Sequence, residues 1–325
     1  MQTDVDVLIV GAGLAGAATA YHLALCSELS VLVVDKESVP GAHSSGRSAA
    51  IIREQGIDPV LQTLMTDGAS VLRRGELAPF DQNGLMLLGL GESDVASHVP
   101  RARGIGLWCP DDGVVEVAKL LDTYLAPTDT RFDTTVSGWT RLADRLEVDT
   151  SRGKIVTRFL VNAGGPWAGA LGDIPLTPKN RTLFGTPPLD WVDPSWPCVW
   201  DVNVGLYFRP ESGGLLLSAC DETPAEPGDY AEDPTALDLL AEKLTATQPG
   251  LDDLRIRSTW VGQRVFAPDQ RFVIGFDPRN NRIFHVAGLG GHGVTASYSV
   301  GKLAADLISR RTTPHAAPFA PARLL

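Results

Sequence analysis

The sequence predicts an α/β protein, because three apolar stretches each run into a glycine-rich turn and then into a helical pattern. These stretches begin near residues 5, 155 and 282. A chain that repeats strand, turn and helix in this way is typical of a parallel sheet covered by helices. Three such turns in one chain could converge on one extended ligand.

The bulk composition supports a folded protein and disfavours polyanionic partners. The chain has 325 residues, of which 44% are hydrophobic, and its formal net charge is −11. The length is compatible with one large domain or two ordinary ones. An acidic chain is repelled by nucleic acid and by anionic membrane surfaces, so we expect neither as a partner.

The cysteines and the chain start indicate a reduced, cytoplasmic protein. Four cysteines lie far apart, at positions 26, 109, 198 and 220, and form neither a disulfide framework nor a zinc motif. We therefore expect no metal site. No signal-peptide pattern precedes the first strand, and no apolar run reaches the ~18 residues that a membrane helix needs.

The first stretch has the features of a dinucleotide site. An apolar strand from Val5 to Val10 is followed by Gly11, Gly13 and Gly16 in the pattern G-x-G-x-x-G, then by a helix that should end near Ser27. The glycines allow a tight turn, a close approach of backbone to pyrophosphate, and close helix packing. A second strand ends about twenty residues later on Asp35, which can accept hydrogen bonds from ribose hydroxyls.

The motif alone does not distinguish NAD from FAD, but the segment after it favours FAD. The stretch "HSSGRSAA" at 43–50 should start another helix, with Ser44 and Ser45 facing the pyrophosphate or the ring beyond it. Arg47 can add positive charge there. A flavin has to be held along its whole length, and a second loop of small residues suits that need.

The far end of the chain repeats this logic. A short strand at 282–288 leads into the loop "GLGGHG" and then into a helix from Val294 to about Arg310. The N-terminus of such a helix would stabilise negative charge on a reduced flavin ring. Between the two ends, a strand from Ile155 to Asn162 meets the turn at Ala163 and Gly164, with a helix starting at Pro166.

These blocks together resemble the D-amino-acid oxidase-like FAD-dependent oxidoreductases, a superfamily that includes glycine oxidase, sarcosine oxidase and bacterial D-amino-acid dehydrogenases. The resemblance is carried by "VLIVGAGLAGAATAYHLA", "HSSGRSAA", "LVNAGGPWAGAL", "TWVGQRVFAPDQRFVIGFDP" and "VAGLGGHGVTASYSVGKLAADLI", and it runs over nearly the whole chain. The second loop is most similar to that of the D-arginine dehydrogenase type.

The resemblance implies a Rossmann-like FAD domain interrupted by a substrate domain built on an antiparallel sheet. Residues 1–75, 106–170 and 256–325 would form the FAD domain, and residues 76–105 and 171–255 the substrate domain. Within the latter, residues 206–220 are expected to form a hairpin and residues 234–250 a helix. FAD should be bound non-covalently, by Gly11, Gly13, Leu14, Ala15, Gly16, Asp35, Lys36, Ser44, Ser45, Arg47, Ser48, Ala49, Val136, Ala163, Gly164, Trp167, Arg264, Gly290, Gly291, His292, Gly293 and Val294.

The resemblance also implies the reaction, in which an amino acid loses its α-hydrogen as hydride to flavin N5. Arg264 would bind the substrate carboxylate, because a guanidinium binds carboxylates with two parallel hydrogen bonds. Arg181 and Tyr207 are further candidates for the carboxylate, and His292 would contact the flavin without acting as a base. Glu54 either faces a basic substrate side chain or, as we favour, pairs with Arg53 in solvent. The tryptophans at 191, 196 and 200 are expected to be packing residues.

The substrate is the most open part of this interpretation. The chain is shorter than its relatives, and the missing residues fall between Arg74 and Cys109, where relatives carry a lid. A more open pocket or a partner subunit over this region would compensate. Oxidation of a D-amino acid is the first hypothesis. The alternatives are oxidation of a secondary amine or of a 2-hydroxy acid, and a non-catalytic flavin-binding subunit. The electron acceptor, O2 or a quinone, is left open.

Overall fold

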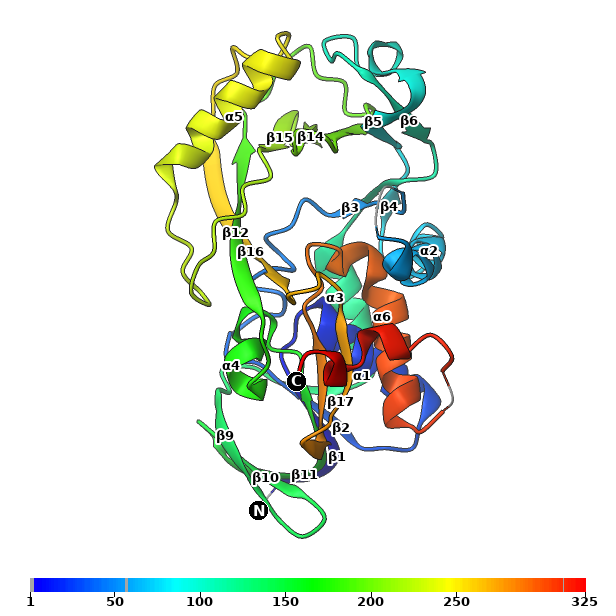
Figure 1. Ribbon diagram of the computed structural model, residues 1–325, viewed down its shortest axis with the longest axis vertical. Helices are drawn as coiled ribbons and strands as arrows, with labels where there is room; N and C mark the ends of the chain where they lie inside the picture. The colour runs from blue at the N-terminus through cyan, green and yellow to red at the C-terminus, as the bar shows by residue number, and fades with distance from the viewer. Residues whose placement is uncertain (1–2, 56–57, 312) are drawn as a thin grey trace.

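The computed structural model describes residues 3–55, 58–311 and 313–325, and these form two large sheets and a small one (Figure 1). The larger sheet has eight strands with the path β17-β18-β11-β1-β2-β8, and β10 and β9 extend it from β11. Its strands are β1 (Thr3–Val10), β2 (Val31–Val34), β8 (Asp129–Arg131), β9 (Val136–Arg141), β10 (Leu146–Thr150), β11 (Gly153–Asn162), β17 (Val273–Asp277) and β18 (Asn280–Ala287).

The parallel strands of this sheet end at a common edge. Val10 lies beside Val34 on one side and Asn162 on the other, and Asn162 lies beside His285 of β18. The central residues of these strands, such as Val7, Val33 and Val161, are apolar and fully buried, as expected for parallel strands covered on both faces. The turns that leave them therefore meet along one edge of the sheet.

Helices α1 (Leu14–Cys26) and α6 (Gly293–Ile308) pack together beside this sheet. Their closest approach is at Gly301, where an added Cβ would lie 2.5 Å from the backbone carbon of Ala18. Small residues on both helices allow this contact. Helix α2 (Pro59–Leu72) packs on α6 as well, and the side chain of Asp58 caps its first turn. Helix α3 (Val117–Leu125) packs on α1.

The second large sheet has seven strands in the order β16-β12-β15-β14-β13-β5-β6 and is antiparallel except for β13 and β5. Its strands are β5 (Leu85–Asp94), β6 (Ile105–Cys109), β12 (Thr177–Gly185), β13 (Cys198–Asp201), β14 (Leu206–Glu211), β15 (Gly214–Ser218) and β16 (Ser258–Phe266). Helix α5 (Pro234–Thr247) covers one face of it, burying Leu240 and Leu244 against the sheet (Figure 1). The predicted α/β architecture with a second, antiparallel sheet is confirmed.

Two strands lie across the predicted domain limits. Residues 106–109 of β6 and all of β16 were assigned to the FAD domain, yet both strands belong to the seven-stranded sheet. Strand β16 continues from this sheet into the cleft described below, so it serves both parts of the molecule. The division into two discontinuous domains stays a prediction.

The prediction of a helix starting in "HSSGRSAA" is wrong. Residues 40–47 form successive turns, with the amide of Gly46 bonded to the carbonyl of Gly41 and that of Arg47 to the carbonyl of His43. Gly41 has a φ of +66° and Ala50 one of +59°, and both values interrupt a right-handed helix. The segment then enters the small sheet of β3 (Ile51–Ile52), β4 (Phe80–Asp81) and β7 (Gly113–Val115).

The shortened region between Arg74 and Cys109 contributes to the small sheet and to the seven-stranded sheet. It contains β4, the β5–β6 hairpin and a 3-10 turn at Val95–Ser97, whose neighbours Val99 and Ala102 are buried in the cluster beneath α5. In the described part of the chain, no helix is both long enough and apolar enough to cross a membrane.

Candidate functional site

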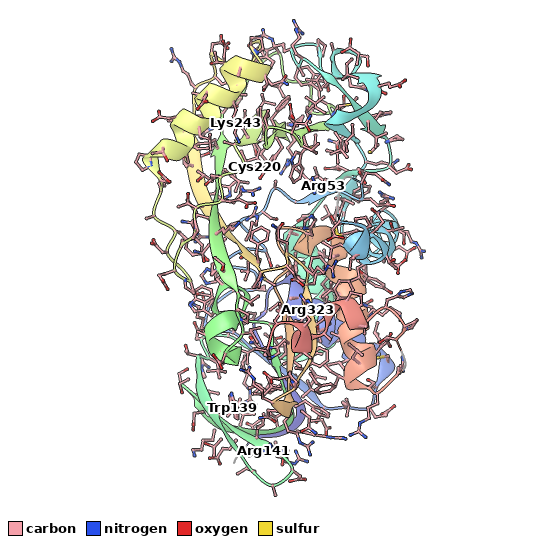
Figure 2. All side chains as sticks on the ribbon, in the orientation of Figure 1. Arg53, Trp139, Arg141, Cys220, Lys243 and Arg323 are labelled. Carbon is pink, nitrogen blue, oxygen red and sulfur yellow. The ribbon has the colours of Figure 1, made fainter. Side chains whose placement is uncertain are left out.

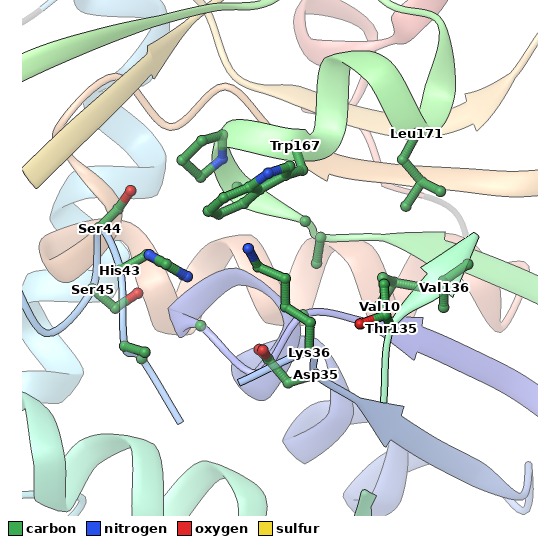
Figure 3. Close-up of a pocket in the computed structure, with 18 of the residues that line it drawn as sticks. Val10, Asp35, Lys36, His43, Ser44, Ser45, Thr135, Val136, Trp167 and Leu171 are labelled. Atoms are coloured by element: carbon green, nitrogen blue, oxygen red, sulfur yellow. The ribbon is translucent and has the colours of Figure 1, made fainter. Parts of the chain in front are cut away.

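A long cleft follows the common edge at which the parallel strands of the larger sheet end. One half is lined by the turns after β1, β2 and β11, and the other by the turns after β1 and β18 together with β16. The halves share Gly13, Ser44, Ser45, Ala163 and Gly165, so they form one continuous groove. Figure 3 shows the first half, with Ser44 and Ser45 on one side and Val136 and Leu171 on the other.

The glycine turn after β1 is closed by backbone contacts that leave no room for side chains. Gly11 has a φ of +111°, and a Cβ there would overlap the carbonyl oxygen of Ala163 on the neighbouring strand. A Cβ on Gly16 would overlap the carbonyl oxygen of Gly11. The turn is thus held between β11 and α1, with its backbone exposed to the cleft at Gly13.

The N-terminus of α1 meets the loop at residues 43–48, here named the serine loop, at this turn. The backbone amide of Leu14 donates to Oγ of Ser45 at 3.0 Å, while α1 has no side-chain cap of its own. Oγ of Ser44 is buried in the same cleft without any hydrogen-bond partner. An unpaired buried hydroxyl beside a helix N-terminus favours an anionic ligand such as a phosphate.

Asp35 and Lys36 line the cleft after β2. One carboxylate oxygen of Asp35 accepts from the amide of Ala12 at 2.6 Å, and the other accepts from the amide of Glu37 at 2.9 Å. Nζ of Lys36 lies 3.5 Å from the ring centre of Trp167 (Figure 3). Asp35 is therefore held rigidly by the turn it follows, with remaining lone pairs for a sugar hydroxyl.

Residues 221–233, here named the strap, reach from the second sheet to the serine loop. The hydroxyl of Tyr230 is 2.6 Å from Nδ1 of His43, whose Nε2 is 2.7 Å from Glu37. Burial raises the pKa of Tyr230 to about 12, so its hydroxyl keeps the proton that it can donate to His43. The side chain of Gln263 on β16 bonds to the backbone of Glu226, Gly228 and Asp229.

Arg47 supports the strap and does not line the cleft. Its guanidinium donates to the carbonyls of Ala42 and Val261 and stacks on Tyr230, with Cζ 4.1 Å from the ring centre. Ala49 is likewise absent from the described lining, because its carbonyl accepts from Arg209 and its side chain is buried under the second sheet.

Arg264 lies at the other end of the cleft and has no anionic partner there. It is on β16, only 9% exposed, and it forms no salt bridge with any residue that the structure describes. Its Nη1 is buried without a hydrogen bond, and its Cδ lies 3.5 Å from the position of a Cβ on Gly291. Burial lowers the pKa of this guanidinium. The arrangement is that of a cation prepared for an anionic ligand.

Arg181 and Tyr207 lie near Arg264 but are engaged within the protein. Arg181 on β12 donates to the carbonyl of Asp221 at 2.9 Å and forms a 3.0 Å salt bridge with Glu222. Tyr207 on β14 is fully buried against Trp200, and burial raises its pKa. The charge of Arg181 is thus matched by the chain itself, whereas that of Arg264 is not.

His292 precedes α6, and its side chain, which makes no capping hydrogen bond, is neutral. Burial and the charge of Arg53 lower its pKa to about 4. Its Nε2 is 3.3 Å from Nη2 of Arg53, a spacing at which the guanidinium donates and the imidazole accepts. A neutral imidazole that already accepts from Arg53 is not available as a base at that nitrogen.

The structure gathers most of the predicted cofactor residues in one groove. Those that line it are Gly11, Gly13, Leu14, Ala15, Asp35, Lys36, Ser44, Ser45, Ser48, Val136, Ala163, Gly164, Trp167, Arg264, Gly290, Gly291, Gly293 and Val294. Gly16, Arg47, Ala49 and His292 lie behind this lining in the described structure.

Several residues of the site were missed by reasoning from the sequence. Arg53 does not pair with Glu54 as predicted, because Glu54 forms a 2.9 Å salt bridge with Arg73, the residue that follows α2. Trp200 is more than a packing residue, since Arg53 stacks on its ring. Gln263 and Tyr230 hold the strap. Only Gln263 had a signal in the sequence, its place beside Arg264.

The protein-family comparison decides the identity of this site. The model of the family "FAD dependent oxidoreductase" matches residues 6–97 and 80–307 of the chain. The chain belongs to this family. The prediction of FAD as cofactor is thereby confirmed.

Individual relatives are distant. A match at 27% identity to "FAD-dependent oxidoreductase domain-containing protein 1" of Xenopus laevis covers 46% of this chain and about a third (34%) of that protein. Glycine oxidase of Geobacillus kaustophilus is 24% identical, over 97% of this chain and 96% of its own. The structure of L-proline dehydrogenase from P. horikoshii superposes with a TM-score of 0.88 at 22% identity, covering 99% and 98% of the two chains.

The residues of the cleft fit FAD. The unpaired hydroxyl of Ser44 and the amide end of α1 suit the pyrophosphate, and the side-chain-free path over Gly13 lets it approach. Asp35 suits the ribose, and the glycine loop at 288–291 gives a flat surface for the ring. In the described structure no cysteine lines either half of the cleft, in keeping with the predicted non-covalent binding.

Proposed function

We propose that this protein oxidises the amine of a small amino acid, with a D-amino acid as the first candidate. The α-carbon gives up a hydride and the nitrogen a proton, which leaves an imine. Water then adds to the imine carbon and releases a 2-oxo acid and ammonia. FAD, when bound, supplies the acceptor for the hydride.

The observation that carries this proposal is the uncompensated guanidinium of Arg264 at the ring end of the cleft. Burying a cation without a partner is costly, and a substrate carboxylate would relieve that cost. A carboxylate on Arg264 would place the adjoining α-carbon beside the ring, which is proposed to lie on the glycine loop at 288–291.

The other residues would orient the substrate and exclude water. Apolar side chains of Leu14, Val265, Leu289 and Val294 line this end of the cleft and keep it dry. Burial raises the pKa of Tyr207, so its hydroxyl stays protonated and adds no negative charge near Arg264. Arg181 would add positive potential without direct contact, because Glu222 occupies it. We propose no general base.

The two-domain division is also proposed. The eight-stranded sheet with α1 and α6 would hold FAD, and the seven-stranded sheet with α5 and the strap would cover the substrate. Strand β16, which carries both Gln263 and Arg264, would couple the two.

An anaerobic absorbance titration of the FAD-loaded protein tests the proposal. Pools of D-amino acids, L-amino acids, N-alkyl amino acids and 2-hydroxy acids are added in turn while the oxidised-flavin band is followed. Bleaching by a primary-amine pool supports the proposal. Bleaching by N-alkyl amino acids alone would move the function to secondary amines, and by hydroxy acids alone to alcohol oxidation. A flavin that no pool bleaches would refute it and favour a non-catalytic subunit. Reoxidation by O2 or by a quinone then identifies the acceptor.

A further inference from the structure

A second guanidinium without an anionic partner lies near Arg264. Arg53 follows β3, and its backbone amide donates to Oγ1 of Thr295 in the first turn of α6. Its side chain crosses to the second sheet, where Cζ lies 4.1 Å from the ring centre of Trp200. Arg53 forms no salt bridge with any residue in the described ranges. Figure 2 labels Arg53 in the region between α2 and the part of the second sheet where Cys220 is labelled.

Arg53 and Arg264 contact adjoining residues of the same short loop. The side chain of Arg264 runs along Gly291, and Nη2 of Arg53 contacts the next residue, His292, at 3.3 Å. Burial, with a smaller contribution from the charge of Arg181, lowers the pKa values of both guanidiniums. Through their contacts with Gly291 and His292, both side chains border the loop at the ring end of the cleft.

The acidic groups around this region are already occupied. Glu222 pairs with Arg181 at 3.0 Å. The carboxylate of Asp221 accepts from the amide and hydroxyl of Thr182 at 2.7 to 3.0 Å. Asp112 is bound by Arg73 at 2.5 Å. His292 is neutral near pH 7 and neutralises no charge. Among the described residues, none of these carboxylates forms a salt bridge with Arg53 or Arg264, so each guanidinium can still pair directly with a carboxylate of a ligand.

We propose that the substrate of this site carries two carboxylates, one on Arg264 and the other on Arg53. This inference rests on the proposed function and narrows it to amino dicarboxylates. A zwitterionic monocarboxylate would leave one guanidinium unpaired in a partly dry site, which is unfavourable. Under the proposed function the second carboxylate belongs to the side chain of an acidic amino acid, and under the secondary-amine alternative it belongs to a carboxymethyl group on the nitrogen. Both present the same charge.

The first test measures binding without oxidation. Glutarate and butyrate have nearly the same carbon skeleton, lack an amine and differ by one carboxylate. Calorimetric titration of the FAD-loaded protein should show glutarate binding about 10- to 100-fold more tightly, the range expected for hydrogen bonds to a charged group. Succinate and malonate report the spacing between the two cations.

Substitution of Arg53 tests whether this residue causes the tighter binding of glutarate. Arg53→Gln should reduce the ratio of the two affinities to within about threefold, and Arg53→Lys should keep most of it because the charge remains. Arg101→Gln is the matched control, since Arg101 also stacks on a tryptophan, Trp191, at 4.1 Å, and Trp191 belongs to the apolar cluster beneath α5. It should leave the ratio unchanged.

The oxidation assay separates this inference from the function on which it rests. Anaerobic bleaching is compared for alanine and aspartate in both configurations, and for N-methylglycine and its carboxymethyl analogue. Faster bleaching by either dicarboxylate supports the inference and identifies where the second carboxylate sits. Equal binding of glutarate and butyrate would overturn the inference, and so would a ratio of their affinities that is unchanged by Arg53→Gln. Bleaching by monocarboxylates would still support the proposed function in that case. No bleaching by any compound would overturn both.

Discussion

Replacing Arg264 by methionine should make the protein more stable and its site inactive. In the ligand-free site the guanidinium is 9% exposed and Nη1 has no hydrogen bond, so folding removes a charge from water without compensation. Exchanging even a buried ion pair for apolar side chains of similar volume is often neutral or stabilising by about 1–4 kcal/mol, and an unpaired ion has no attraction to a partner to lose. We expect Arg264→Met to raise the free energy of unfolding by about 1–2 kcal/mol.

Ligand binding should change in the opposite direction. A carboxylate on Arg264 would make two charge-assisted hydrogen bonds, and each is worth about 1.5–3 kcal/mol. Allowing for incomplete additivity, Arg264→Met should weaken binding of a carboxylate ligand by roughly 100- to 1,000-fold, or about 3–4 kcal/mol. The measurements are urea unfolding with saturating FAD and without it, and calorimetric titration with glutarate.

Arg209 supplies a matched control. It is 8% exposed on β14, but it donates to the carbonyls of Ala49 and Pro210 and pairs with Glu211 at 2.7 Å. Arg209→Met should therefore lower the free energy of unfolding by about 1–3 kcal/mol. If Arg264→Met destabilised the protein as much as Arg209→Met does, Arg264 would have a structural role and the reasoning about an uncompensated charge would be refuted.

Three further predictions concern packing, cofactor retention and pH. Gly16→Ala should abolish folding or FAD binding because its Cβ would overlap the glycine turn, whereas Gly138→Ala, with no atom within 4 Å of its Cβ, should leave thermal stability and flavin content near wild type. Tyr230→Phe removes the 2.6 Å contact between the strap and His43 and should speed FAD release about 5- to 10-fold, as expected for the loss of one hydrogen bond. Stopped-flow fluorescence measures this rate, and an unchanged rate would show that the strap does not retain FAD. Burial lowers the pKa of His22 to about 4, so between pH 6.5 and 4 the unfolded chain binds more protons than the folded protein, and the free energy of unfolding falls as the pH is lowered. His22→Gln should flatten this decline. An equally steep decline in the variant would contradict the assignment of the pH dependence to His22.

Short-range sequence patterns determined much of the fold of this chain. The glycine pattern after the first strand, the acid at the end of the second and the small-residue loop before the last helix are contiguous signals, and each forms the turn that its spacing predicts. The steric limits at glycine and the period of the apolar residues act over a few positions, so both can be recognised in a single sequence. The failed helix in "HSSGRSAA" marks the limit of such reasoning, since left-handed backbone at both ends interrupts it.

The charge balance of the site was decided only by the tertiary structure. Glu54 is next to Arg53 in the chain, yet it pairs with Arg73, while Arg181 finds Glu222 about forty residues away. Such partners depend on which strands become neighbours, and sheet order is set by packing across the whole molecule and not by nearby residues. The sequence by itself therefore identified only a flavin site and a candidate residue that would bind a carboxylate. Which arginines are left without a partner, and hence what charge the substrate should carry, depended on the fold.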